Sequence, residues 1–227
     1  MRILDRILGR SLPATGELGY FGLMTWWTSS FSKAQRDYME AAFCSAGLPA
    51  RARPLTRDRG LVVYPTAAAL LTVLADRLSE KPEDRGLASQ VLAQAERRAS
   101  AEDDVLGRHF VYHQMIRLHA RWKDKFADAT DLILDACHKQ IKLAPDAAKA
   151  LREMHPEAPL PAHLGYQQAS TLLEQEGVYD PAIALCREAQ AGGWNGNWSW
   201  RIQRMARKMY ESGYPVKSMS SSGITRL

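Results

Sequence analysis

Two histidines four residues apart are the first candidates for chemistry. His109 and His113 fall one turn apart in a stretch with helical spacing, and His119 follows about one and a half turns later. Imidazoles at this spacing can share a metal ion. However, no carboxylate completes an HExxH pattern, and Tyr112 belongs to the apolar side of the same helix. We therefore expect polar or partly buried histidines, and no metal or other cofactor.

The carboxylates and a search for catalytic motifs give little further evidence of chemistry. Four aspartates fall near one side of the next helical stretch, namely Asp124, Asp128, Asp131 and Asp135. Such a row is usually exposed to solvent, and contact with a basic partner is the alternative. The sequence contains no phosphate loop, no GxGxxG turn, no nucleophile elbow and no zinc spacing. An enzyme built from scattered residues leaves no motif, so an enzyme of an unrecognised family stays open.

The most suggestive group combines tryptophans with cations near the C-terminal end. Its members are Trp194, Trp198, Trp200, Arg201, Arg204, Arg207 and Lys208. Arg201, Arg204 and Lys208 are three and then four residues apart, which places them along one side of a helix. Cations beside aromatic rings can neutralise phosphates and stack on bases. The alternatives are an acidic protein partner and a capping helix whose cations favour the C-terminal end of the helix dipole.

The charge of the chain is concentrated in the same region. The net charge of the 227 residues is +5. Residues 194–227 contain six basic residues and one acidic residue, so residues 1–193 sum to zero. No stretch approaches the ~20 apolar residues of a membrane span, and residues 1–13 lack the apolar core of a secretory signal. The three cysteines lie far apart, which fits buried thiols in a reducing compartment. We expect a cytoplasmic protein.

Helical spacing dominates the middle of the chain. It predicts helices over residues 66–78, 82–99, 105–120 and 127–143, with Pro145 ending the last one and residues 145–164 as a connector. Before them, residues 1–43 form an aromatic-rich helical module whose rings make a core or, alternatively, a partner-binding cleft. Ser32 is the expected cap of its last helix. Residues 44–65 are rich in proline and arginine and read as a loop, with anion binding as the alternative.

A helix hairpin follows the connector. Its turn holds Gly177, which can end a helix in the left-handed conformation, and Asp180 followed by Pro181, a capping residue and a first-turn proline. The hairpin resembles a tetratricopeptide repeat, whose second helix carries Gly-x-Tyr-x-x-Ala-x-x-x-(bulky)-x-x-Ala. The matching residues are Gly177, Tyr179, Ala182, Cys186 and Ala189. Two departures are Trp194 in place of the usual proline and a first helix without tryptophan.

The hairpins also match one another. Tyr112 to Met115 align with Tyr166 to Ala169, 54 residues later, and Cys137 aligns with Cys186, 49 residues later. Repeats of this length are typical of α-solenoids, in which each hairpin buries its apolar stripe against its neighbour. The opening segment and the last hairpin also resemble those of uncharacterised bacterial proteins, which implies no activity.

These patterns predict an all-α protein of stacked helix hairpins. Residues 66–212 form three tetratricopeptide-like hairpins and a C-terminal capping helix, and residues 213–227 form a flexible tail. The resemblance implies a non-enzymatic scaffold for protein–protein interaction, with the concave face of the stack as the contact surface. The alternative is a nucleic-acid-binding module that uses the basic helix. The predicted partner-binding residues are Tyr112, Gln114, Gln168, Trp200, Arg201, Arg204 and Lys208.

Overall fold

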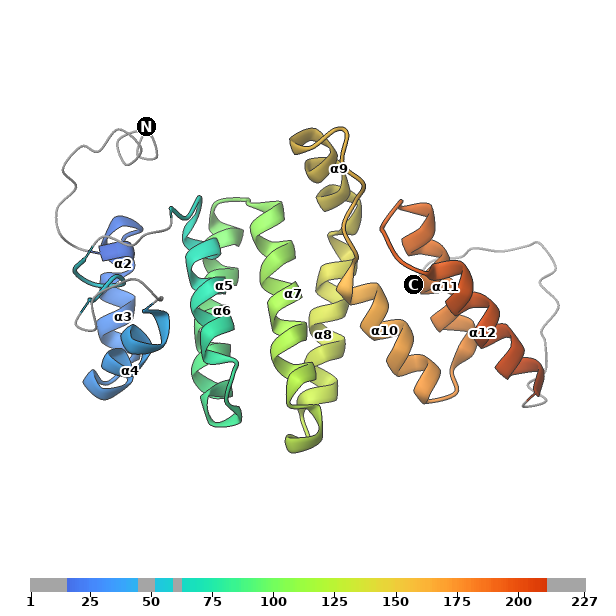
Figure 1. The fold of residues 1–227 in the computed structure, drawn as a ribbon, viewed down its shortest axis with the longest axis horizontal. Coiled ribbons are helices and arrows are strands. Elements are labelled where there is room, and N and C mark those ends of the chain that lie inside the picture. The colour runs from blue at the N-terminus through green and yellow to red at the C-terminus, as the bar shows by residue number, and fades with distance from the viewer. Residues whose placement is uncertain (1–15, 45–51, 59–62, 212–227) are drawn as a thin grey trace. The chain divides into compact units, whose positions relative to one another are not determined.

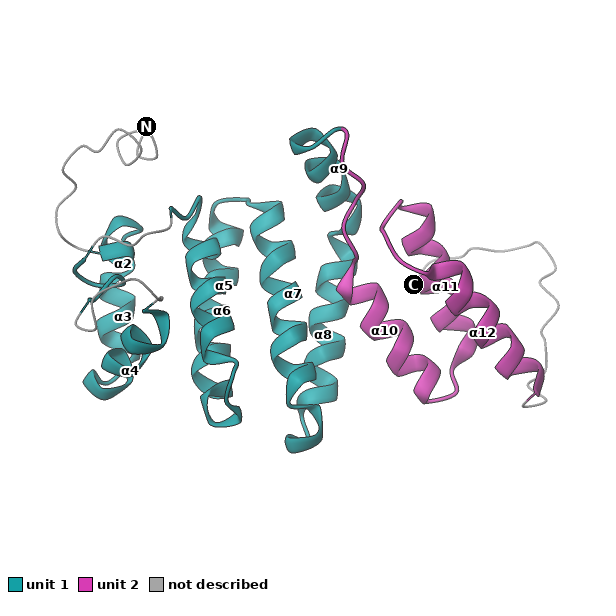
Figure 2. Ribbon diagram, in the orientation of Figure 1, with its two compact units in different colours: residues 1–156 teal, residues 157–227 magenta. Residues whose placement is uncertain are grey.

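The computed structural model describes residues 16–44, 52–58 and 63–211, and it divides the chain into two compact units (Figure 2). The N-terminal unit comprises residues 1–156 and the C-terminal unit comprises residues 157–227. The described residues contain eleven α-helices and no strand, with one isolated β-bridge between Ala162 and Asn195. The predicted all-α class is therefore confirmed. The boundary at residue 156 falls inside the predicted array of residues 66–212.

The N-terminal unit holds the first eight of these helices (Figure 1). They are α2 (Gly16–Tyr20), α3 (Met24–Ser30), α4 (Lys33–Phe43), α5 (Ala67–Leu78), α6 (Arg85–Ala101), α7 (Val105–Arg121), α8 (Ala129–Lys142) and α9 (Ala144–Met154). Short 3-10 turns, η1 (Pro82–Asp84) and η2 (Lys123–Lys125), precede α6 and α8. Each helix from α5 to α8 packs against the next one, and α5 also contacts α7. The four helices therefore form two adjacent hairpins, α5–α6 and α7–α8.

The core of this unit follows the predicted apolar stripes. Leu70, Leu71 and Leu74 of α5 are completely buried, as are Val91 and Leu92 of α6. The Thr66 side chain accepts a hydrogen bond from the Ala69 amide and so caps α5. Burial of these side chains supplies most of the hydrophobic free energy that stabilises the pair, since each contributes about 1.5–3 kcal/mol.

The aromatic segment before the hairpins belongs to the same core. Ser32 caps α4 through a reciprocal capping box with Gln35, as the sequence predicts. Trp27, Phe31 and Phe43 are buried in the cluster that includes α5 and α6. Residues 1–15 of the predicted module lie outside the described residues, and within residues 16–43 these burials support the core over the partner-binding cleft.

The described part of the arginine-rich loop is held by carboxylates. The buried Glu40 side chain accepts hydrogen bonds from the Leu55 amide, at 3.1 Å, and from the Thr56 hydroxyl. The Arg53 guanidinium donates to Asp37 at 2.8 Å. Arg57 pairs with its neighbour, Asp58. These two arginines therefore have internal anionic partners, which lessens the support for anion binding by the loop.

The α8 helix ends at Lys142, before Pro145, as predicted, but the predicted connector over residues 145–164 is wrong in its first half. Pro145 lies in the first turn of α9, which runs from Ala144 to Met154. A first-turn proline loses no hydrogen bond, because the first amides of a helix have no intrahelical acceptor. Ala144, Ala147 and Ala148 of α9 are buried, and α9 contacts α7. These small side chains let the two helices approach closely.

The C-terminal unit contains α10 (Leu164–Gln175), α11 (Tyr179–Ala191) and α12 (Trp198–Glu211), and α11 packs against both of the others. Gly177 has a φ of +74°, as its predicted role at the end of α10 requires. Ala182, Cys186 and Ala189 are completely buried. The prediction that Asp180 is the N-terminal capping residue of this helix is wrong, because α11 begins at Tyr179 and Asp180 lies within its first turn.

Two further expectations concern residues at the edges of the described ranges. The predicted flexible tail, residues 213–227, lies outside the described residues, as do Arg51 and Arg59 of the loop. Among the helices that the structure describes, none has the length and apolar character needed to cross a bilayer.

Candidate interaction surfaces

The first candidate surface is shared by α5 and α7 of the N-terminal unit. Asp76 of α5 accepts a hydrogen bond from the Gln114 amide at 2.9 Å and pairs with Arg117 at 3.4 Å. Farther along α5, the Ser79 carbonyl accepts a hydrogen bond from Arg121 at 3.0 Å. From Asp76 to Ser79 on α5, the contacting residue on α7 also moves toward the C-terminal end, from Gln114 to Arg121. The two helices therefore run parallel.

Several side chains lie exposed on this shared side. Val73 is three residues before Asp76, and His113 and Phe110 are four and seven residues before Arg117. Residues at these spacings share a helix face, so all of them lie on the side that the Asp76–Arg117 pair marks. Val73 is 37% exposed, Phe110 is 47% exposed, and His113 is partly buried. We call Val73, Asp76, Phe110, His113 and Arg117 the α5–α7 face.

Two of the predicted partner-binding residues lie on α7 without being part of this surface. Tyr112 and Gln114 are buried. The Tyr112 hydroxyl donates to Glu96 of α6 at 2.9 Å, and Gln114 also accepts a hydrogen bond from Arg117 at 3.2 Å. Burial and the Glu96 hydrogen bond raise the pKa of Tyr112 to about 12. Both side chains connect helices within the unit and leave little surface for a partner.

The second candidate surface lies on α12, whose inner side packs against α11 and makes polar contacts with α10. Trp198, Met205 and Met209 are buried there, as expected of a capping helix. The Glu174 carboxylate of α10 is 8% exposed and accepts hydrogen bonds from Arg204 and from Lys208, the latter at 2.9 Å. Burial raises the pKa of Glu174, but the hydrogen bonds from these cations outweigh burial and lower that pKa overall.

Arg201 is also used within the unit. Its guanidinium donates to the Gln167 carbonyl at 3.4 Å and to the hydroxyls of Ser170 and Thr171 at 3.3 and 3.1 Å. These three acceptors lie on α10. The three predicted basic residues, Arg201, Arg204 and Lys208, thus all bind α10 with at least one polar atom. Gln168, also on α10, is partly buried.

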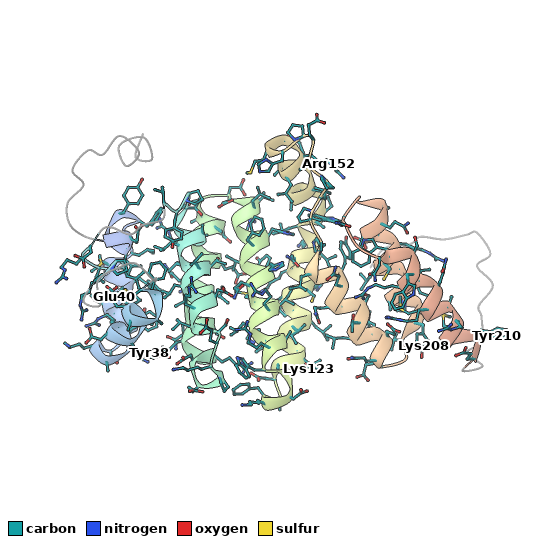
Figure 3. The ribbon with its side chains drawn as sticks, viewed as in Figure 1. Tyr38, Glu40, Lys123, Arg152, Lys208 and Tyr210 are labelled. Atoms are coloured by element: carbon teal, nitrogen blue, oxygen red, sulfur yellow. The ribbon has the colours of Figure 1, made fainter. Side chains whose placement is uncertain are left out.

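The outward side of α12 is different in character. Trp200 is 54% exposed, Tyr210 is 83% exposed, and Gln203 is exposed between them. The Arg207 side chain is 71% exposed and lies 3.7 Å from Glu211. In Figure 3, Tyr210 projects from the end of α12. We call Trp200, Gln203, Arg207 and Tyr210 the outer α12 surface.

A pocket of about 430 Å³ adjoins this surface at Trp200. It is lined by Gln190, Gly193, Trp194, Asn195, Gly196, Asn197, Trp198, Ser199 and Trp200. The Trp198 indole donates to the Trp194 carbonyl at 2.8 Å, and the Gln190 amide donates to the Ser199 hydroxyl at 3.1 Å. The pocket can therefore offer amide groups and aromatic surface to an uncharged group.

The candidate histidines of α7 do not gather with further potential metal ligands. In the described parts of the chain, no group of three or more His, Cys, Asp or Glu side chains could hold a metal ion. His109 and His119 are buried, and burial lowers the pKa of each to about 4. The Arg85 guanidinium, which donates to His119 Nδ1 at 3.3 Å, also lowers the pKa of His119.

Two of the four aspartates in the predicted row form ion pairs within the N-terminal unit. Asp128 pairs with Arg85 at 3.0 Å, and Asp135 pairs with Lys139 at 3.0 Å. Asp124 and Asp131 are exposed. The row is therefore largely a solvent-facing set of carboxylates, as the sequence indicates.

Sequence reasoning missed three exposed side chains. Val73 and Phe110 look like members of apolar stripes, and Tyr210 follows the buried Met209. A helical projection of α7 could have separated Phe110 from the buried residues His109 and Val111.

No family model, curated protein or solved structure matches this chain.

Proposed function

We propose that the chain is a tetratricopeptide-like, non-enzymatic scaffold for protein–protein interaction that contacts its partner through the α5–α7 face. The observation that carries this proposal is the exposure of Phe110 and Val73 on parallel first helices of two hairpins. Aromatic and apolar side chains that remain exposed among polar ones are typical of protein contact sites.

The arrangement of helices supports the tetratricopeptide-like reading. The hairpins α5–α6 and α7–α8 lie side by side, and their first helices contact each other. The α9 helix contacts α7 as α7 contacts α5, so it continues the row of first helices. In such a row, a partner reaches successive first helices through one continuous surface.

Site-specific photocrosslinking tests this proposal. A photoreactive phenylalanine analogue replaces Phe110 in one variant and Leu132 in the other, the latter being 37% exposed on α8. We expect the Phe110 position to give one discrete crosslinked protein. This product should disappear when an excess of chain without the photoreactive group competes, and also when the Phe110 variant carries the second substitution Val73→Glu. Equal crosslinking from both positions, or none from the Phe110 position, contradicts the proposed surface.

A further inference from the structure

We infer that the outer α12 surface and the adjoining pocket bind an acidic protein segment that carries a large apolar side chain. This surface lies in the C-terminal unit and shares no residue with the α5–α7 face.

The first observation is the exposure of two aromatic side chains that the fold does not need. The inner side of α12 already buries Trp198, Met205 and Met209. Trp200 and Tyr210 lie on the other side, 54% and 83% exposed. Large amphipathic aromatics of this kind are enriched where one protein anchors another, because each contributes much contact area and a polar group.

The second observation is the sign of the charge around these aromatics. Arg201, Arg204, Arg207 and Lys208 carry four positive charges, against the negative charges of Glu174 and Glu211. The region therefore keeps a net charge of +2 after its internal pairing, from 4 − 2. The Arg204 guanidinium stacks on the Trp200 ring at 4.4 Å, which brings positive charge to the exposed indole. A partner with complementary charge is acidic.

The third observation is the pocket that Trp200 shares with this surface. None of its lining residues, all of which the structure describes, has an ionisable side chain. Its volume of about 430 Å³ is enough for one large side chain with part of its backbone. The Asn195 and Asn197 amides can bind peptide groups, while the exposed Trp200 ring can contact an apolar side chain. The pocket thus selects an uncharged anchor and the outer α12 surface selects acidic flanks.

The same observations favour a protein segment over nucleic acid. Nucleic-acid affinity rests on many cations that neutralise phosphates. Here Arg204 and Lys208 share their charge with Glu174, and Arg201 donates to α10. Arg204 also covers part of the Trp200 ring on which a base would stack. A single anchor pocket matches a peptide side chain better than a repeating phosphate backbone.

Selection from a random peptide library displayed on phage tests the inference. Against the full chain at low salt, we expect enriched sequences that combine Asp or Glu with one aromatic or large aliphatic residue. Synthetic copies labelled with fluorescein then give affinities by anisotropy. We expect Arg207→Glu and Trp200→Ala each to weaken binding by about tenfold or more, the scale of one interface anchor.

A matched control separates specific docking from general charge. Arg97 is an exposed arginine on α6 of the N-terminal unit, so Arg97→Glu makes the same charge change outside the unit that holds the outer α12 surface. We expect Arg97→Glu to bind as the unaltered chain does. Equal losses in Arg97→Glu and Arg207→Glu, no enrichment, or equally tight binding of fluorescein-labelled oligo(dT), would overturn the inference. Circular dichroism confirms that each variant is folded.

Discussion

The Arg204 guanidinium of α12 donates two hydrogen bonds to the Glu174 carboxylate of α10, one from Nε at 3.0 Å and one from Nη2. Glu174 is 8% exposed, so this ion pair closes a polar contact between two helices at the edge of the apolar core. Lys208 completes the carboxylate's set of donors at 2.9 Å. Two of the basic residues that stand out in the sequence therefore stabilise the unit itself.

Removal of this guanidinium should destabilise the C-terminal unit. In Arg204→Ala, Glu174 stays largely buried with Lys208 as its remaining cation, and a charged group that loses hydrogen bonds costs about 1–3 kcal/mol. Arg207→Ala is the matched control on the same helix, because its exposed pair with Glu211 contributes at most about 1 kcal/mol. Urea unfolding of the two variants measures the difference. Equal midpoints for both would show that Glu174 does not need the Arg204 guanidinium.

The buried face of α11 should reject a larger side chain. Ala182 is completely buried, whereas Ala184, two residues away, is exposed. Ala182→Leu should overpack the contact and cost about 1–3 kcal/mol, while Ala184→Leu should leave stability within about 0.5 kcal/mol. Thermal unfolding of both variants checks the expectation. An unchanged melting temperature for Ala182→Leu would refute the close approach of helices at this position.

The buried face of α11 and the Glu174–Arg204 pair show what the sequence can and cannot predict. The three-and-four spacing of small residues correctly predicts that Ala182, Cys186 and Ala189 are buried, since a local pattern sets a helix face. The Glu174–Arg204 pair joins residues 30 positions apart. Its formation depends on how α12 packs, which local spacing does not encode. The α9 helix was missed for another reason, because a proline is compatible with both a helix end and a helix start.

Two glycines should respond in opposite directions to the same substitution. Gly177 has a φ of +74° and Gly86 lies within α6, and neither has a heavy atom within 4 Å of an added Cβ. Gly177→Ala should therefore cost about 1 kcal/mol through backbone strain alone. Gly86→Ala should gain about 0.5–1 kcal/mol, because alanine loses less backbone entropy in a helix. Melting temperatures that move the same way in both variants would contradict this reading of the α10–α11 turn.

Acid should weaken the N-terminal unit through its buried histidines. The folded pKa values of His109 and His119 are about 4, below the ordinary 6.5. The unfolded chain therefore binds more protons between pH 6.5 and about 4, so the free energy of unfolding falls as pH drops through that window. His119→Gln should make this dependence smaller than it is in the unaltered chain. Urea titrations across the window measure both slopes, and identical slopes would refute the role of His119.

The nucleic-acid alternative for α12 is open to a direct test. If the helix bound phosphates, affinity would fall with salt by about 0.9 log units per contact per log unit of salt. Replacing Arg201, Arg204 and Lys208 together by Ala would then abolish binding. We expect the unaltered chain to cause no mobility shift of random single- or double-stranded probes at low salt, because all three side chains already bind α10. A shift that disappears in the triple variant, with the helical signal retained in circular dichroism, would restore the nucleic-acid function.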